Sequence, residues 1–253
     1  MEFALQTLLF LFFAAAIASF LDTLAGGGGL ITIPALIVAG VPPLAALGTN
    51  KLQSSVGSGT ASFLLLTRRK ILWSSIKPLM LMAFIGSMVG GILVQFINAT
   101  ALGFIIPLVL VLIAIYFIAA PYLRFDSTTP KVGDKTYKNT VIPLIGVYDG
   151  MFGPGTGSFF AAAGVSLRAM ELIKATATAK PLNFATNIAS LLVFILAGQI
   201  VWTAGVVMMF GQVLGAWLGS HYLFKVNPKV LRILIVTLCL IMLGQYCYRQ
   251  FIS

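Results

Sequence analysis

The residues from Ala101 to Ala119 read ALGFIIPLVLVLIAIYFIA, a run of 19 residues without one charged side chain. A helix of this length, rising about 1.5 Å per residue, can cross a hydrocarbon core of about 30 Å. Pro181 to Trp202 is a second uncharged window. Every backbone amide in lipid needs a partner within its own segment, and these runs lack the alternation of a β-barrel strand. They therefore predict membrane-spanning helices.

The composition of the whole chain agrees with this prediction. Of 253 residues, 59 % are hydrophobic and only 9 % are charged, whereas soluble domains carry about 25 % charged residues. The net charge of +10 does not indicate nucleic acid, because the basic residues lie in short clusters between apolar runs. Cys239 and Cys247 form no CxxC motif, and the single His221 cannot build a metal site. We expect an all-α integral membrane protein without a metal, cofactor or nucleic-acid partner.

An internal repeat divides the chain at its one long hydrophilic stretch, Arg124 to Lys138. Asp22 precedes the run AGGGGLITIP, and Asp149 precedes the run GMFGPGTGSFF at an offset of 127 residues. Two further matches follow in the same order at similar offsets: Gly48-Thr49-Asn50-Lys51 with Ala177-Thr178-Ala179-Lys180, and Gly86, Gly90 and Gly91 with Gly211, Gly215 and Ala216. Small residues four apart also let membrane helices approach closely, so packing alone explains part of the last match.

The repeat predicts a domain organisation of residues 1–123, a hydrophilic linker at 124–137, and residues 138–253. Each half resolves into five apolar segments when the glycine clusters are treated as breaks. These segments are roughly residues 3–21, 28–40, 44–66, 71–97 and 101–119, then 138–150, 155–167, 172–197, 201–222 and 229–251. The second segment of each half is too short to span, which is typical of the half-helices of secondary transporters.

The distribution of basic residues favours five crossings per half over four. With five, thirteen basic residues fall on one side and Arg249 falls alone on the other. The positive-inside rule then places both termini outside and makes the repeats inverted, with half-helices meeting near the bilayer midplane. Re-entrant hairpins would give the same placement. The thirteen residues are Arg68, Arg69, Lys70, Lys77, Arg124, Lys131, Lys135, Lys138, Arg168, Lys174, Lys225, Lys229 and Arg232.

The glycine clusters Gly26 to Gly29 and Gly153 to Gly157 are candidates for an anion site. Glycine and proline weaken helices and expose backbone amides, and unwound backbone in lipid needs a partner. A half-helix that starts at such a break presents free N–H groups and a positive dipole end, for which an anion is the natural ligand. The alternative is a tight helix crossing that needs only small side chains.

Lys51 and Lys180 are the two basic residues outside the loops, and they occupy matching places in the repeat. An ionisable residue within the membrane is a candidate for function, although snorkelling or a salt bridge is the alternative. Pro181 disfavours helix at Lys180, which leaves a further backbone break open. Hydroxyl, amide and ammonium groups together suit an oxyanion. We expect the substrate to contact Gly26, Gly27, Gly28, Gly29, Thr49, Asn50, Lys51, Gln53, Ser54, Gly153, Gly155, Thr156, Gly157, Thr178, Lys180, Asn183 and Asn187.

Asp22 and Asp149 are a matching pair of acids in apolar surroundings. A carboxyl group in a partly dry site can load and release a proton during transport, which makes both residues candidates for proton coupling. The alternatives are a helix N-cap and a fixed counter-ion for Lys51 or Lys180.

At these positions the sequence resembles the sulfite exporter TauE/SafE family of bacterial membrane transporters. The resemblance covers essentially the whole chain and rests on Asp22 with its glycine run and Pro34, Gly48 to Lys51, the turn at Arg68 to Lys70, and the second-half match at Asp149 and Thr178 to Lys180. It implies a plasma-membrane transporter of sulfite, sulfonates or related anions. An anion channel or a non-transporting membrane subunit remains an alternative. An enzyme is not expected, because the sequence offers no nucleophile–base pair or metal cluster to carry catalysis.

Overall fold

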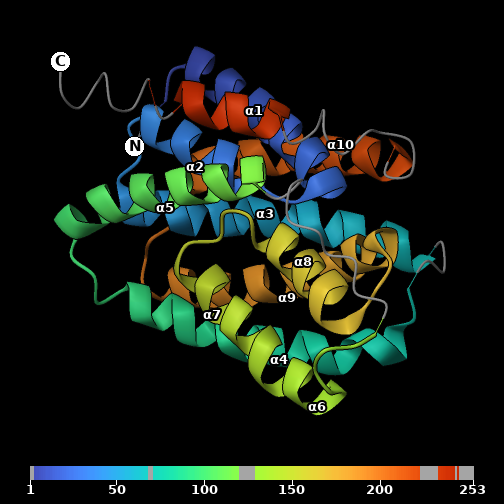
Figure 1. Cartoon of the computed structure of the whole chain (residues 1–253). Helices are drawn as coiled ribbons and strands as arrows, with labels where there is room; N and C mark the ends of the chain where they lie inside the picture. The colour runs from blue at the N-terminus through green and yellow to red at the C-terminus, as the bar shows by residue number, and fades with distance from the viewer. Residues whose placement is uncertain (1–2, 68–70, 120–128, 223–232, 243, 245–253) are drawn as a thin grey trace.

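The computed structural model describes residues 3–67, 71–119, 129–222, 233–242 and 244, whose regular structure is entirely helical (Figure 1). The first half contains α1 (Leu5–Ala25), α2 (Gly29–Val38), α3 (Pro43–Thr67), α4 (Trp73–Val94) and α5 (Ala99–Ala119). The second half contains α6 (Asp134–Thr136), the π-helix η1 (Tyr137–Val141), α7 (Ile142–Met151), α8 (Thr156–Arg168), α9 (Leu172–Leu196), α10 (Trp202–Tyr222) and a short apolar helix at Ile233–Met242.

The lengths of these helices fall into two groups. Five described helices, α1, α4, α5, α9 and α10, are long and apolar enough to cross a membrane. Helix α3 is as long as α9, with 25 residues, but its buried face is rich in polar side chains. Helices α2 and α8 have only 10 and 13 residues, which is too short to cross about 30 Å of hydrocarbon.

Burial is inverted relative to a soluble protein. Large apolar side chains of α5 point outwards, among them Phe104, Leu108, Leu112 and Ile115. Ionisable and polar side chains of α3 and α9 are enclosed instead, including Lys51, Gln53, Lys180 and Thr186. Lipid as the surrounding solvent requires this arrangement, because tails accept apolar surface and exclude polar groups. The chain is therefore a multi-pass helical membrane protein.

Helices α3 and α9 pack against each other at the centre of the molecule (Figure 1). Helix α10 contacts α3 and also packs along α1 on one side of this centre. Helix α4 contacts α9 and also packs along α7 on the other side. The short helices α2 and α8 pack beside α3 and α9, respectively, so both breaks that precede them lie near the centre.

Glycines set the close approach of the two outer helix pairs. A methyl group added at Gly90 of α4 would overlap the Val147 carbonyl group of α7, whose carbon would lie 2.8 Å away. One added at Gly215 of α10 would overlap the backbone of α1, with Phe20 N at 2.8 Å. Backbones this close gain dispersion contacts that larger side chains would prevent, which confirms the packing role expected for this matched pair of glycine motifs.

The described helices follow the segments expected from the sequence, including the two short ones after the glycine clusters. Of the last expected segment, 229–251, only residues 233–242 and 244 are described. The possible break at Lys180 is wrong, because α9 continues through Pro181. Helices in a membrane tolerate proline where neighbouring helices support the freed backbone, and α9 lies against α3, α4 and α8. Several predicted topology residues and Cys247 lie outside the described residues: Arg68, Arg69, Lys70, Arg124, Lys225, Lys229, Arg232 and Arg249.

Candidate functional site

The first glycine cluster breaks the chain between α1 and α2. Gly26 and Gly27 have φ angles of 73° and 124°, which side chains rarely adopt, so the chain can turn here only with glycine. The backbone N–H groups of Gly27 and Gly28 both donate to Asp22 Oδ1, at 2.9 and 3.0 Å. Asp22 thus caps the start of α2 from the end of α1, which is the N-cap alternative that the sequence left open.

The second cluster breaks the chain between α7 and α8 in a related way. Gly153 and Gly155 have φ angles of 95° and 78°. The Thr156 hydroxyl donates to Asp149 Oδ1 at 2.7 Å. In the first half, two backbone N–H groups donate to the corresponding acid, Asp22. The two breaks therefore share their position and their acid, but differ in the donors that the acid receives.

The two breaks lie against each other. Ser158 Oγ, in the first turn of α8, donates to the carbonyl oxygen of Ala25 at 2.5 Å. A methyl group at Gly26 would meet the backbone of Gly157 and Ser158 within 3 Å. Small residues are needed on both sides of this contact, which brings the exposed backbone of each half to one place.

Each lysine forms an ion pair with the acid of the opposite half. Lys51 Nζ lies 3.1 Å from Asp149 Oδ1, and Lys180 Nζ lies 3.4 Å from Asp22 Oδ2. Each ammonium group also donates to the backbone carbonyl of its acid, near the C-terminal end of α7 or α1. A cation is favoured there by the negative end of the helix dipole. The lysines therefore join the halves, and the counter-ion alternative describes these contacts.

Both pairs are buried, although to different degrees. The side chains of Lys51 and Asp149 are 0 % and 1 % exposed, whereas Asp22 is 18 % exposed beside a buried Lys180. Removing one partner of a buried pair is costly, because the other charge is then left without compensation. Neither lysine snorkels to the surface in this arrangement.

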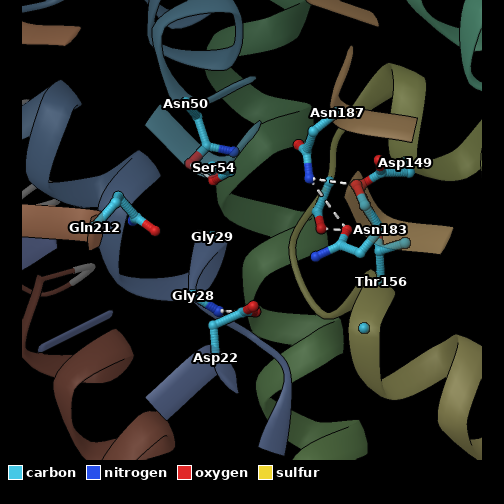
Figure 2. Close-up of a pocket in the computed structure, with 12 residues that line it drawn as sticks. Asp22, Gly28, Gly29, Asn50, Ser54, Asp149, Thr156, Asn183, Asn187 and Gln212 are labelled. Carbon is cyan, nitrogen blue, oxygen red and sulfur yellow. Dashed lines mark hydrogen bonds between the residues drawn. The ribbon is translucent and has the colours of Figure 1, made fainter. Parts of the chain in front are cut away.

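Between the breaks lies a polar cavity of about 360 Å³, including its opening (Figure 2). Figure 2 shows Asn50, Ser54 and Gln212 on one side and Asn183, Asn187, Asp149 and Thr156 on the other. Hydroxyl and amide groups face this space from helices of both halves. The lining residues are Asp22, Gly28, Gly29, Asn50, Ser54, Asp149, Gly153, Thr156, Gly157, Asn183, Asn187 and Gln212.

The cavity includes the glycine, amide, hydroxyl and carboxyl groups that the sequence predicted for the site, but neither of the two predicted lysines. All of its lining residues except Gln212 were predicted from the sequence. Several predicted residues lie behind the lining or nearby, where they hold it: the two lysines pair with the acids, Thr49 Oγ1 accepts from Val201 N, and Gln53 bonds Asn50. The predicted residues that do not line the cavity are Gly26, Gly27, Thr49, Lys51, Gln53, Gly155, Thr178 and Lys180.

Gln212 is the residue that the sequence analysis missed. Its amide group donates to Gln53 Oε1, and Gln53 Nε2 in turn donates to Asn50 Oδ1 at 2.7 Å. Thr32 Oγ1 also donates to Asn50 Oδ1, at 2.6 Å. The signal was present in the repeat, because an isolated amide follows Gly211 where Ser87 follows Gly86.

One atom of this site has no partner. Asp149 Oδ2 is buried, and it forms no hydrogen bond to any residue that the structure describes. A buried polar atom without a bond is costly, so such an atom calls for an explanation such as a proton, a water molecule or a bound ligand. The site as a whole offers two ammonium groups, two carboxylates and several neutral donors around one space.

The fold and site thus define a membrane protein with charged groups enclosed between two broken helices, which is an arrangement suited to moving a small solute. Comparison with known proteins agrees. Residues 11–246 match the family model described as Sulfite exporter TauE/SafE. The chain belongs to this family, whose members are membrane transporters and not enzymes.

Three relatives extend along nearly all of the chain. A probable membrane transporter protein ORF9 from Sinorhizobium sp is 42 % identical over 93 % of this chain and 90 % of its own length. The probable membrane transporter protein YfcA of Escherichia coli K12 is 42 % identical over 94 % of this chain and 88 % of its own. A probable membrane transporter protein of Haemophilus influenzae is 39 % identical over 99 % and 98 %. No solved structure matches the chain.

Proposed function

We propose that this protein is a secondary active transporter of small anions, with sulfite, organosulfonates or related sulfur-containing anions as substrates. The observation that carries the proposal is the pair of crossed Lys–Asp contacts beside a polar cavity between two helix breaks. The transporter would act in the bacterial plasma membrane with both termini outside. The match to a family described as sulfite exporters supports sulfur-containing anions as the class of substrate.

The two halves act as inverted repeats in this proposal, with residues 1–123 and 138–253 joined by the linker at 124–137. The largest helix contacts support a repeat, because exchanging the two halves maps these contacts onto one another. Helix α1 packs against α10 as α7 packs against α4, and α3 packs against α10 as α9 packs against α4. Rocking of one half against the other would then open the cavity to each side in turn.

The anion binds between the breaks, close to the two ammonium groups. Gly153 and Gly157 line the cavity, and a methyl group on either would lie 2.9 Å from Lys51 Nζ or 3.6 Å from Lys180 Nζ, respectively. The absence of side chains at these glycines leaves both cations within reach of a ligand. The amide groups of Asn50 and Asn183 and the hydroxyl group of Ser54 supply neutral donors to its oxygen atoms.

A proton accompanies the anion. Two lysines and two acids sum to no net charge, so an anion that enters alone leaves the site negative, which is costly in a membrane. Protonation of a carboxyl group removes that cost, so anion and proton binding favour each other. Asp22 and Asp149 are the two candidates for the proton carrier.

Counterflow in proteoliposomes tests the transport of anions and identifies the substrate. Vesicles are loaded with unlabelled sulfite, sulfate, thiosulfate or ethanesulfonate, and the uptake of the same labelled anion is followed. Uptake by protein-containing vesicles beyond protein-free ones is expected for at least one sulfur-containing anion. The matched controls are Lys51→Met and Lys180→Met, which should weaken uptake, and the exposed Lys135→Met, which should not. Failure of the whole panel would refute the proposal.

A further inference from the structure

The two acids at the cavity differ in their hydrogen bonds, although they occupy matching places in the two halves. Asp22 Oδ1 accepts two backbone N–H bonds, and its Oδ2 faces Lys180. Both oxygen atoms of Asp22 thus have donors directed at them. Asp149 Oδ1 faces Lys51 and Thr156, whereas its Oδ2 has no partner among the described residues.

A proton on either oxygen atom of Asp22 would lie beside a donor that is already directed at that atom. Backbone N–H groups cannot reverse into acceptors, and an ammonium group offers no lone pair. A proton on Asp149 Oδ2 meets no such obstacle, because no hydrogen atom of the described residues is bonded there. Asp149 is one of the residues that line the cavity, so a proton on its carboxyl group would lie next to the space proposed for the anion.

Lys51 stays in place when Asp149 becomes neutral. Its ammonium group also donates to the backbone carbonyl oxygen of Asp149, and this bond does not depend on the charge of the carboxyl group. Protonation therefore leaves a buried cation in position beside Gly153, where a methyl group would lie only 2.9 Å from Nζ. That cation lacks a counter-ion until an anion arrives.

We propose that Asp149 alone carries the coupling proton, on Oδ2, while Asp22 remains a permanent counter-ion and helix cap. The proposal rests on the proposed anion transport and specifies its mechanism. A proton from water forms the O–H bond on Asp149, and Lys51 exchanges the carboxylate for the substrate as its counter-ion. When the anion leaves, the proton returns to water and the Lys51–Asp149 pair forms again.

Charge balance makes the coupling strict for a monovalent anion. The empty site holds two ammonium groups and two carboxylates, and the site loaded with one proton and one anion is again neutral. Either species alone leaves one charge uncompensated in the membrane, which disfavours movement of the half-loaded protein. Proton and anion therefore cross together and in the same direction.

The neighbouring ionisable groups agree with this assignment. Lys51 approaches Asp149 from α3, while Lys180 from α9 and Asp22 from α1 belong to the opposite ion pair. Helix α4, which packs along α7, contacts it through the uncharged Ser87, and Lys77 of α4 is exposed. On α7 itself, Tyr148 directs its hydroxyl group to the carbonyl oxygen of Pro154.

The test compares accumulation driven by a pH gradient in proteoliposomes containing wild type, Asp149→Asn, Asp22→Asn or the exposed Asp134→Asn. Ethanesulfonate and thiosulfate serve as probes because their own charge is constant between about pH 5 and 8. Wild type and Asp134→Asn should accumulate ethanesulfonate about tenfold per pH unit. Asp149→Asn should accumulate nothing above the external concentration, whatever rate of counterflow it retains. Asp22→Asn should transport more slowly, yet its accumulation should still scale with the gradient.

Accumulation by Asp149→Asn in proportion to the pH gradient would overturn the assignment. Loss of accumulation in Asp22→Asn but not in Asp149→Asn would overturn it as well. Absence of any anion counterflow in wild type would instead refute the proposed function. A sodium gradient that replaces the pH gradient as driving force would also overturn the assignment. A second measurement covers the case that Asp149→Asn does not fold. Purified wild type and Asp22→Asn should each take up one proton per ethanesulfonate bound, and no uptake in either would contradict the proposal.

Discussion

Replacing Lys51 and Lys180 singly with methionine should destabilise the protein by unequal amounts. Lys51→Met leaves Asp149 1 % exposed with one hydroxyl donor, so the loss should approach the 3–5 kcal/mol typical of breaking a buried pair. Lys180→Met leaves Asp22 18 % exposed with two backbone N–H donors, so we expect a loss of about 1–2 kcal/mol. The similar distances of the two ion pairs, 3.1 and 3.4 Å, would by themselves predict similar effects.

Thermal unfolding of the purified variants in detergent measures this difference. A loss of 3–5 kcal/mol corresponds to a decrease in Tm of roughly 6–20 °C, and the loss expected for Lys180→Met corresponds to roughly 2–8 °C. The double variant Lys51→Met/Asp149→Asn should recover most of the lost stability, because no charge is then left unpaired. Equal decreases for the two lysine variants, or no recovery in the double variant, would show that the remaining donors and exposure of each acid do not determine the loss.

Three further predictions follow from the packing and the topology. Gly90→Ala should destabilise the protein by about 1–3 kcal/mol through overlap with the Val147 carbonyl, whereas Gly103→Ala, where a methyl group meets nothing within 4 Å, should leave Tm unchanged. Gly153→Ala should abolish counterflow without preventing expression, because it strains a φ of 95° and crowds Lys51; full activity would exclude Gly153 from the site. Single cysteines in the three predicted cytoplasmic loops should resist an impermeant thiol reagent in intact cells, and ready labelling of all three would contradict the proposed orientation; these loops contain Arg68, Arg124 and Lys225.

Much of the fold follows from the sequence, because two strong local signals determine it. Uncharged runs such as Ala101 to Ala119 can only be helices in lipid, and the structure has α5 at Ala99–Ala119. The glycine clusters mark the ends of α1 and α7, since only glycine adopts the positive φ angles found there. Pro181 gave a misleading signal, because packing of α9 overrides its local preference for a break.

The members of the site were predictable from the repeat, but their pairing was not. Matching places in the two halves singled out both lysines and both acids, whereas a local match cannot show that each lysine crosses to the acid of the other half. Gln212 was missed because one amide in an apolar helix has no local partner in sequence, and its bond to Gln53 spans 159 residues. The difference between the two acids depends on individual donors, which only the three-dimensional arrangement reveals.

Uptake of labelled ethanesulfonate and thiosulfate into proteoliposomes under an imposed pH gradient tests the central claim most directly. The protein should drive the internal concentration of at least one of these anions above the external one when the outside is acidic. A protonophore should dissipate the gradient and release what was accumulated. Uptake that stops at equal concentrations whatever the gradient, as a channel would give, or no uptake of either anion would contradict proton-coupled transport through this site.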